Sequence, residues 1–245
     1  AVVDALGIES LHSVVGPSMG GMTALAFAAQ FPDAARSLVL ISTALRALPY
    51  AISLRSLQRE MIRRDPDWRD GSYVGDGPVT GMRLARKLGM ITYRSGKEWE
   101  ARFGRERVPG ERPTGDPFAP EFEIESYLEH HAQKFTGTFD ANCYLYLSRA
   151  SDLFDFAEHG TTIEAAARRI RADRMLVIGV ESDFLCRDGQ QRDLTGVCSP
   201  GGKRVTHVEL DSIHGHDSFL VDMDRFRPVL SRFFTGDWSA LAATG

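Results

Sequence analysis

The segment Gly16-Pro17-Ser18-Met19-Gly20 constrains the fold of this chain most strongly. A short apolar run at residues 13–16 predicts a strand before it, and residues 19–30, rich in Ala, Leu and Met, predict a buried helix after it. In such a strand-to-helix turn a serine is held on a sharp bend with its hydroxyl clear of the backbone. We expect Gly16 and Gly20 to let strand and helix approach closely. Ser18 is therefore a candidate nucleophile, and the Met19 amide a candidate oxyanion donor at a helix N-terminus.

The apolar runs along the chain predict an α/β architecture with a parallel sheet. Strands separated by helices indicate parallel pairs joined by crossovers. Residues 49–170 show helical patterns without a convincing strand, and they are too many for a simple crossover. We therefore expect a sheet-bearing core from residues 1–48 and 171–245, with residues 49–170 inserted as a helical lid. The strands are expected at 13–16, 38–41, 175–180 and 205–210.

Within the lid, helical periodicity is interrupted by one polar stretch. Residues 96–120 are polar, with several prolines and glycines in their second half, and predict a loop. After the last strand, an amphipathic segment predicts a terminal helix that Pro228 could break. The helices are expected at 51–64, 78–90, 121–134, 142–157 and 219–234.

A serine nucleophile needs a base and a carboxylate that orients the base. In the fold that carries G-x-S-x-G, the order along the chain is serine, acid, histidine. Asp183 lies three residues after the third predicted strand and is the candidate acid, with Glu181 and Asp188 as competitors. The sequence thus places an acid where this chemistry requires one.

Two histidines, His214 and His216, follow the last predicted strand, and spacing alone does not choose between them. Either could serve as the base. A His-x-His pair can also bind a metal, but no cysteine or further histidine with ligand spacing lies near this one. We predict no metal site.

Composition excludes several classes of protein. The chain has 245 residues, a formal net charge of -4 and 25% charged residues, which argues against a dedicated nucleic-acid binder. No run of 18 apolar residues exists, so no membrane span is expected. The three cysteines, Cys143, Cys186 and Cys198, are an odd number without C-x-x-C spacing. That pattern favours a reducing, cytoplasmic location over a disulfide framework.

Longer segments carry a more specific signal than the serine motif. In order along the chain they are Gly16-Pro17-Ser18-Met19-Gly20-Gly21-Met22, Ser56-Leu57-Gln58-Arg59-Glu60, Ala85-Arg86-Lys87-Leu88-Gly89 with Ile91-Thr92-Tyr93, residues 122–128, residues 139–146, Ser182-Asp183, and Gly215-His216-Asp217-Ser218-Phe219-Leu220. With these segments the chain resembles the homoserine/serine O-acyltransferases of the α/β-hydrolase superfamily. The likeness covers nearly the whole chain and includes the lid.

The resemblance implies roles for individual residues. The family's Gly-His-Asp motif matches Gly215-His216-Asp217, which favours His216 over His214 as the base, and the family's acid falls on Asp183. Arg59 is implied to bind the carboxylate of an amino acid, and Asp217 its amino group. A guanidinium binds a carboxylate through two hydrogen bonds, and an aspartate accepts from an ammonium.

The resemblance also implies an activity. It is acyl transfer from an acyl-CoA to the hydroxyl of L-serine or L-homoserine, for cysteine or methionine biosynthesis, by a cytoplasmic homodimer without a bound cofactor. Residues 47–50 with 55–59, and residues 142–149, resemble the serine O-succinyltransferase branch more than the homoserine O-acetyltransferase branch. Homoserine O-acetyltransferase remains an alternative. So do an esterase with the same triad, a non-catalytic member and an acyltransferase with another hydroxyl acceptor.

One feature departs from the family pattern. Several strands and an oxyanion loop normally precede the nucleophile in this superfamily, whereas Ser18 lies near the start of this sequence. The first predicted strand would then be an exposed edge. We expect the 245 residues to be the C-terminal part of a longer enzyme.

Overall fold

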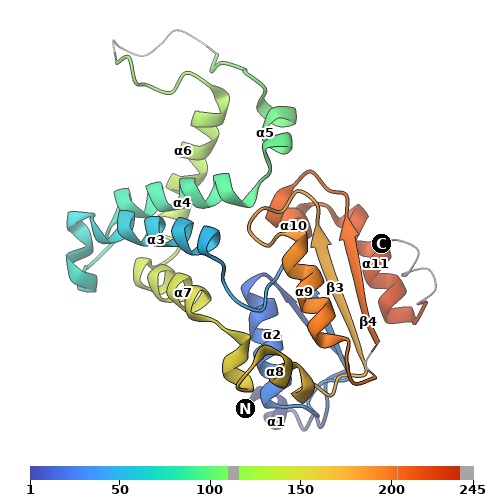
Figure 1. The fold of residues 1–245 in the computed structure, drawn as a ribbon. Helices are drawn as coiled ribbons and strands as arrows, with labels where there is room; N and C mark the ends of the chain where they lie inside the picture. The colour runs from blue at the N-terminus through green and yellow to red at the C-terminus, as the bar shows by residue number, and fades with distance from the viewer. Residues whose placement is uncertain (110–115, 203, 238–245) are drawn as a thin grey trace. The chain divides into compact units, whose positions relative to one another are not determined.

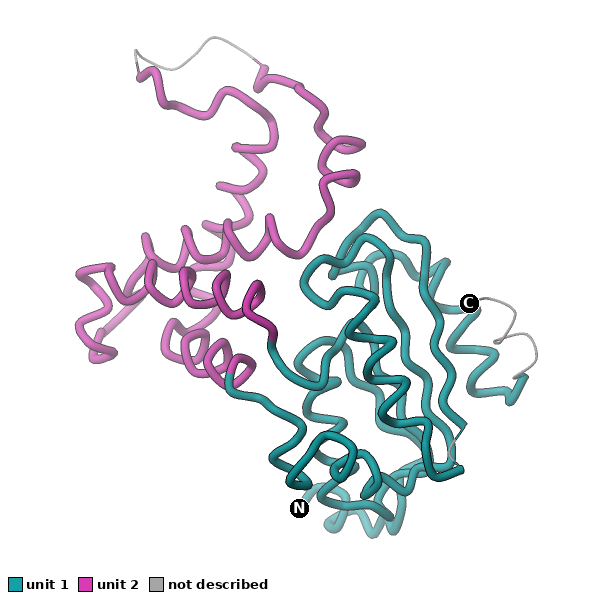
Figure 2. Tube along the Cα trace, viewed as in Figure 1, with its two compact units in different colours: residues 1–47, 153–245 teal, residues 48–152 magenta. Residues whose placement is uncertain are grey.

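The computed structural model describes residues 1–109, 116–202 and 204–237. The chain forms two compact units, shown in different colours in Figure 2. We call residues 1–47 with 153–245 the sheet unit, and residues 48–152 the helical unit. None of the helices in the described ranges combines the length and apolar character needed to cross a membrane.

Within its described residues, the sheet unit has four parallel strands in the order β1-β2-β3-β4. Both central strands are almost fully buried along their length, as expected for a parallel sheet covered on two faces. The predicted α/β class with a parallel sheet is confirmed. The strands are β1 (Val14–Pro17), β2 (Ser37–Ile41), β3 (Arg174–Val180) and β4 (Arg204–Leu210).

Alternate side chains of the strands pack against helices on opposite faces of the sheet. Leu38 and Leu40 join a core with α2 (Met19–Gln30), α8 (Ile163–Arg169) and α9 (Asp188–Cys198). Val39 and Ile41 join a second core with α11 (Met223–Thr235). Figure 1 shows α2, α8 and α9 together on one side of the sheet and α11 on the other. The sheet unit also contains the short helices α1 (Val2–Ala5) and α10 (Ser218–Val221).

The helical unit has its own small core, in which Ile62, Met82, Ala85 and Ala141 are buried. Gly81 allows two of its helices to touch, because a Cβ atom there would lie 2.5 Å from the Met61 carbonyl oxygen. The helices are α3 (Pro49–Arg63), α4 (Val79–Tyr93), α5 (Gly96–Phe103), α6 (Glu123–Phe135) and α7 (Ala141–Leu153).

The insertion differs from the predicted lid of residues 49–170 at its C-terminal end. Residues 153–170 belong to the sheet unit. Phe156, Ala166 and Ile170 are almost completely buried in the core that also holds α2 and β3, which explains why they pack with the sheet. The inserted helical unit comprises residues 48–152.

Two local predictions were wrong. Within the predicted loop of residues 96–120, α5 forms because the Ser95 hydroxyl caps it by accepting from the Glu98 amide. Residues 110–115 of that loop lie outside the described residues. The predicted terminal helix is two helices, α10 and α11, separated at Asp222, and α11 continues through Pro228.

Candidate active site

Ser18 lies in the turn between β1 and α2, in a strained backbone conformation with φ 51° and ψ -121°. A non-glycine residue with positive φ is held there by its surroundings. The Ser18 amide donates to the Ile41 carbonyl at 2.8 Å, and the Thr43 hydroxyl donates to the Ser18 carbonyl at 2.6 Å. These bonds fix the backbone of the turn, so the serine hydroxyl is presented in one orientation.

Close packing at this turn depends on Gly16 and Gly21. A Cβ atom on Gly16 would lie 2.2 Å from the Gly20 carbonyl oxygen, and one on Gly21 would lie 2.5 Å from the Thr43 side chain. A Cβ atom on Gly20 would meet only the Pro17 ring, at 3.4 Å. The expectation that Gly16 and Gly20 both permit close approach is therefore correct for Gly16 and wrong for Gly20. Gly21 instead permits the close contact between α2 and the Thr43 side chain.

The structure brings Ser18, His216 and Asp183 together from three separate loops. His216 Nε2 lies 2.8 Å from Ser18 Oγ, and His216 Nδ1 lies 2.8 Å from Asp183 Oδ2. Asp183 and His216 follow β3 and β4 respectively, and both are buried. The carboxyl ends of parallel strands meet at one edge of a sheet, which is why residues so distant in sequence converge.

Hydrogen bonds to the Asp183 carboxylate determine the orientation of the chain of contacts from Asp183 through His216 to Ser18, which we call the catalytic relay. Asp183 Oδ1 accepts from the amides of Leu185 at 2.9 Å and Cys186 at 3.0 Å. This leaves Oδ2 to accept from His216 Nδ1–H, so that Nε2 is the acceptor for the Ser18 hydroxyl. A serine oxygen whose proton is directed at a neutral imidazole can act as a nucleophile.

The two alternative candidates for the acid, Asp188 and Glu181, have different surroundings from Asp183. Asp188 pairs with Arg192 and lies 3.4 Å from Nε2 of His207, and burial lowers the pKa of His207. Glu181 is exposed. The ring that contacts Ser18 is that of His216, so the geometry favours His216 over His214, in agreement with the resemblance.

Ser182 joins the loop that carries Asp183 to the loop that carries His216. Its hydroxyl donates to the Ser212 carbonyl at 2.5 Å and accepts from the Gly215 amide at 2.9 Å. Ser182 thus links the loop that carries Asp183 to the loop that carries His216. No role for Ser182 was predicted from the sequence, although Ser182-Asp183 is among the segments that resemble the family.

Replacing Ser182 with alanine is expected to lower kcat by about 10–100-fold with a smaller change in KM, because the acid and the base would lose their common anchor. Steady-state kinetics of S182A and S182T would test this. The threonine variant keeps the hydroxyl and should recover most of kcat. Equal losses in both variants would indicate a packing role.

Gln191 provides a second connection, between the turn after β2 and the acid loop. It is fully buried, and its Nε2 donates to the Thr43 carbonyl at 2.6 Å and lies 3.4 Å from the Cys186 carbonyl. Thr43 in turn holds the Ser18 backbone. Neither Thr43 nor Gln191 belongs to a sequence motif, so only the fold shows their role.

The predicted oxyanion donor is the first residue of α2. The Met19 amide makes no hydrogen bond within the part of the chain that the structure describes, while the amides of Gly21 and Met22 are within 3.3 Å of the Ser18 carbonyl. A donor at a helix N-terminus is available for a developing negative charge beside Ser18.

Arg59 lies on α3 in the helical unit and is engaged within that unit. Its Nη2 pairs with Asp152 Oδ2 at 2.7 Å, and its Nη1 donates to the Ser148 hydroxyl at 2.8 Å. Asp152, whose side chain is only 2% exposed, also pairs with Arg55. The implied role of Arg59 in binding a carboxylate stays a prediction. Asp217 is half-buried and directly follows His216, and its implied contact with an amino group stays a prediction as well.

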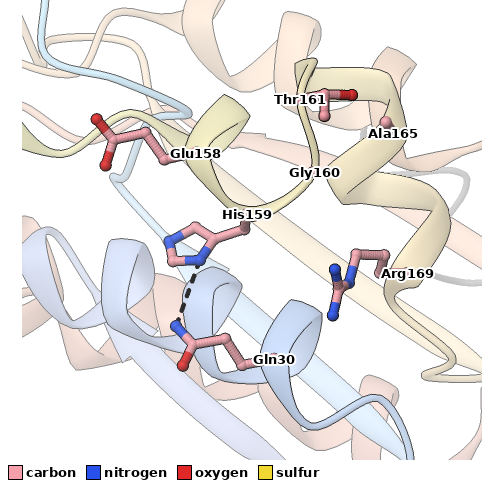
Figure 3. A pocket seen from close by; sticks show the side chains of 7 residues that line it. All are labelled: Gln30, Glu158, His159, Gly160, Thr161, Ala165 and Arg169. Carbon is pink, nitrogen blue, oxygen red and sulfur yellow. Dashed lines mark hydrogen bonds between the residues drawn. The ribbon is translucent and has the colours of Figure 1, made fainter.

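Each unit also has a cavity. In the sheet unit, a cavity of about 560 Å³ is lined by residues that include Gln30, His159 and Arg169, and Figure 3 shows Gln30 donating to His159. Gln30 ends the helix that begins beside Ser18, about 18 Å away by helix rise, so this cavity is not the triad site. In the helical unit, a cavity of about 600 Å³ is lined by residues that include Arg59 and Arg149.

Comparison with known proteins places this geometry in a family. Residues 1–221 match the family model described as the alpha/beta hydrolase fold. The chain is 52% identical over 231 residues to a serine O-succinyltransferase of Litchfieldella anticariensis, covering 94% of this chain and 63% of that protein. A serine O-succinyltransferase of Xylella fastidiosa is 52% identical over 234 residues, covering 95% and 63% respectively. The chain therefore spans just under two thirds of the length of these relatives.

Solved structures show the same fold. A homoserine O-acetyltransferase from Bacillus anthracis superposes with a TM-score of 0.81 at 24% identity, covering 92% of this chain and 60% of that one. The structure of esterase E22 superposes with a TM-score of 0.79 at 24% identity, covering 91% of this chain and 61% of that one. The resemblance to homoserine/serine O-acyltransferases is confirmed. This chain belongs to the α/β-hydrolase fold family.

Proposed function

We propose that this protein is an acyl-CoA-dependent O-acyltransferase acting on the hydroxyl of L-serine or L-homoserine, with succinyl transfer to serine favoured. The observation that carries the proposal is the Ser18–His216–Asp183 relay, with both contacts at 2.8 Å. It occurs in a chain 52% identical to proteins named serine O-succinyltransferase. The relay supports nucleophilic acyl transfer, and the relatives support the substrate class.

In the first half-reaction Ser18 becomes acylated. His216 takes the proton from Ser18 Oγ as this oxygen attacks the thioester carbonyl of the acyl-CoA. The Met19 amide donates to the developing oxyanion, and Asp183 stabilises the imidazolium. The tetrahedral intermediate then collapses: the carbon–sulfur bond breaks, and His216 returns the proton to the departing CoA thiolate.

In the second half-reaction the acceptor hydroxyl takes the acyl group. His216 removes its proton, the acceptor oxygen attacks the acyl-enzyme ester, and Ser18 leaves with the proton returned by His216. Arg59 is proposed to bind the carboxylate of the acceptor, and Asp217 its ammonium group. The product is an O-acyl amino acid, activated for later replacement of the acyl group by sulfur. Because water competes with the acceptor for the same ester, orientation of the acceptor decides the outcome.

The decisive experiment crosses donors with acceptors in the full-length protein. Acetyl-CoA and succinyl-CoA are each assayed with serine and homoserine, by CoA release and by mass spectrometry of the amino acid. Succinyl-CoA with serine is expected to give the highest kcat/KM. Serine and homoserine differ by one methylene, worth about 10–200-fold in discrimination. CoA release that does not depend on any amino acid would instead indicate a hydrolase.

The same proposal includes a cytoplasmic homodimer that requires no bound cofactor or metal. None of the three cysteines is joined in a disulfide, in keeping with a reducing compartment. Light scattering of the purified full-length protein would measure the oligomeric state, and a mass corresponding to one chain would contradict the homodimer.

A further inference from the structure

A cysteine lies beside the acid and the base of the triad. Each of the residues Asp183, Cys186 and His216 offers one atom that can bind a metal, and these three atoms lie within 4.8 Å of one another. All three residues are buried. Among the described residues, no other group of three such side chains is arranged closely enough to hold a metal ion. The catalytic relay as proposed does not use the Cys186 thiol.

The local fold builds this cluster. The turn after β3 places the Cys186 amide 3.0 Å from Asp183 Oδ1, so the cysteine is tied to the carboxylate through its backbone. The His216 ring is tied to the same carboxylate through Nδ1 at 2.8 Å. Cys186 and His216 are thus both held by hydrogen bonds to Asp183, which keep the three donor atoms close together.

The donor set has a definite preference among cations. A thiolate sulfur, an imidazole nitrogen and a carboxylate oxygen together suit borderline and soft divalent ions such as Zn²⁺ and Cd²⁺, whereas Mg²⁺ prefers oxygen donors alone. Tetrahedral zinc with bonds of about 2.0–2.3 Å needs its donors roughly 3.3–3.8 Å apart. Side-chain rotations that move the donors by about 1 Å would close the cluster, with water as the fourth ligand.

We infer that Asp183, Cys186 and His216 form an inhibitory site for a thiophilic divalent cation, a conclusion whose inhibitory part depends on the proposed function. The cation binds by ligand exchange without any redox change. The Cys186 thiol proton and the His216 Nδ1 proton pass to the buffer, and metal-bound water leaves. The cation replaces the proton that His216 and Asp183 share, so the base loses its orienting partner and Ser18 is no longer activated.

The first test measures binding without reference to activity. Full-length protein is titrated with Cd²⁺, and the ultraviolet charge-transfer absorption of cadmium–thiolate is recorded. We expect about one equivalent of tightly bound Cd²⁺, with C186S losing the band and C143S keeping it. Cys143 is an exposed cysteine of the helical unit and gives a matched control. A band of unchanged intensity in C186S would overturn the site.

The second test measures inhibition, with each variant compared with its own rate in the absence of metal. Cd²⁺ or Zn²⁺ should inhibit CoA release reversibly, with recovery on chelation, while Mg²⁺ should have no effect. The inhibitory concentration should rise by about 10–100-fold in C186S, and C186A serves as a second variant if C186S folds poorly. Equal sensitivity of folded C186S and wild type would overturn the proposal. A Cys186-dependent band in a protein that transfers no acyl group would leave the metal site standing and refute the proposed function.

Discussion

Replacing Ser18 with alanine is expected to lower kcat for acyl transfer by about 10⁴-fold or more. The Ser18 oxygen forms the covalent bond to the acyl group in the proposed mechanism, and it lies 2.8 Å from His216 Nε2, the nitrogen that takes its proton. Incubation with acyl-CoA in the absence of amino acid gives a second measurement. Wild type should gain the mass of one acyl group, and S18A should not.

The matched control for this variant is S199A. Ser199 is an exposed serine of the sheet unit at the C-terminal end of α9, and its hydroxyl donates to the Thr195 carbonyl in the same helix. Its replacement should leave kcat within about twofold, since surface substitutions of this kind are close to neutral. Turnover by S18A comparable with that of S199A would remove Ser18 from the mechanism.

The sheet was predictable because its signals are local. Runs of apolar residues bounded by turn residues placed each strand within one residue of its observed ends: residues 205–210 were predicted where β4 spans Arg204–Leu210. The G-x-S-x-G motif likewise placed Ser18 correctly, because a strained turn between strand and helix requires small residues nearby.

The limits of the helical unit were less predictable because they depend on tertiary packing. The segment that contains Phe156 and Ile170 is helical or irregular in pattern, like the helical unit before it. Only its burial in the core with α2 assigns it to the sheet unit. In the same way, α5 depends on one capping hydroxyl, that of Ser95, within a stretch whose composition predicts a loop.

Among the site residues too, some could be predicted from local sequence, whereas others depend on contacts between distant loops. Spacing could not choose between His214 and His216. The resemblance favoured His216, and the structure places that ring on Ser18. The hydroxyl of Ser182 and the amide of Gln191 act through bonds to backbone carbonyls of other loops, at Ser212 and Thr43, and no residue pattern encodes such contacts.

Replacing Gly16 with alanine is expected to destabilise the sheet unit by about 3–5 kcal/mol. The new Cβ would lie 2.2 Å from the Gly20 carbonyl oxygen and 2.7 Å from the Gly21 nitrogen. Both are backbone atoms at the start of α2, so relief requires the helix to move away from β1. Such a shift would disturb the core that includes α2 and the turn that holds Ser18. Denaturant unfolding, followed by circular dichroism, would measure the loss of stability.

The variant G20A separates this steric effect from the general cost of changing a glycine. Gly20 lies one residue inside α2, and its Cβ would meet only Pro17 Cδ, at 3.4 Å. An alanine in a helix is favoured over glycine by about 0.8–1.0 kcal/mol, so G20A should be neutral or slightly stabilising. If G16A and G20A change the unfolding free energy equally, the close approach of β1 and α2 does not depend on Gly16. A large loss in G16A alone shows that the motif's first glycine is required by backbone packing and its last is not.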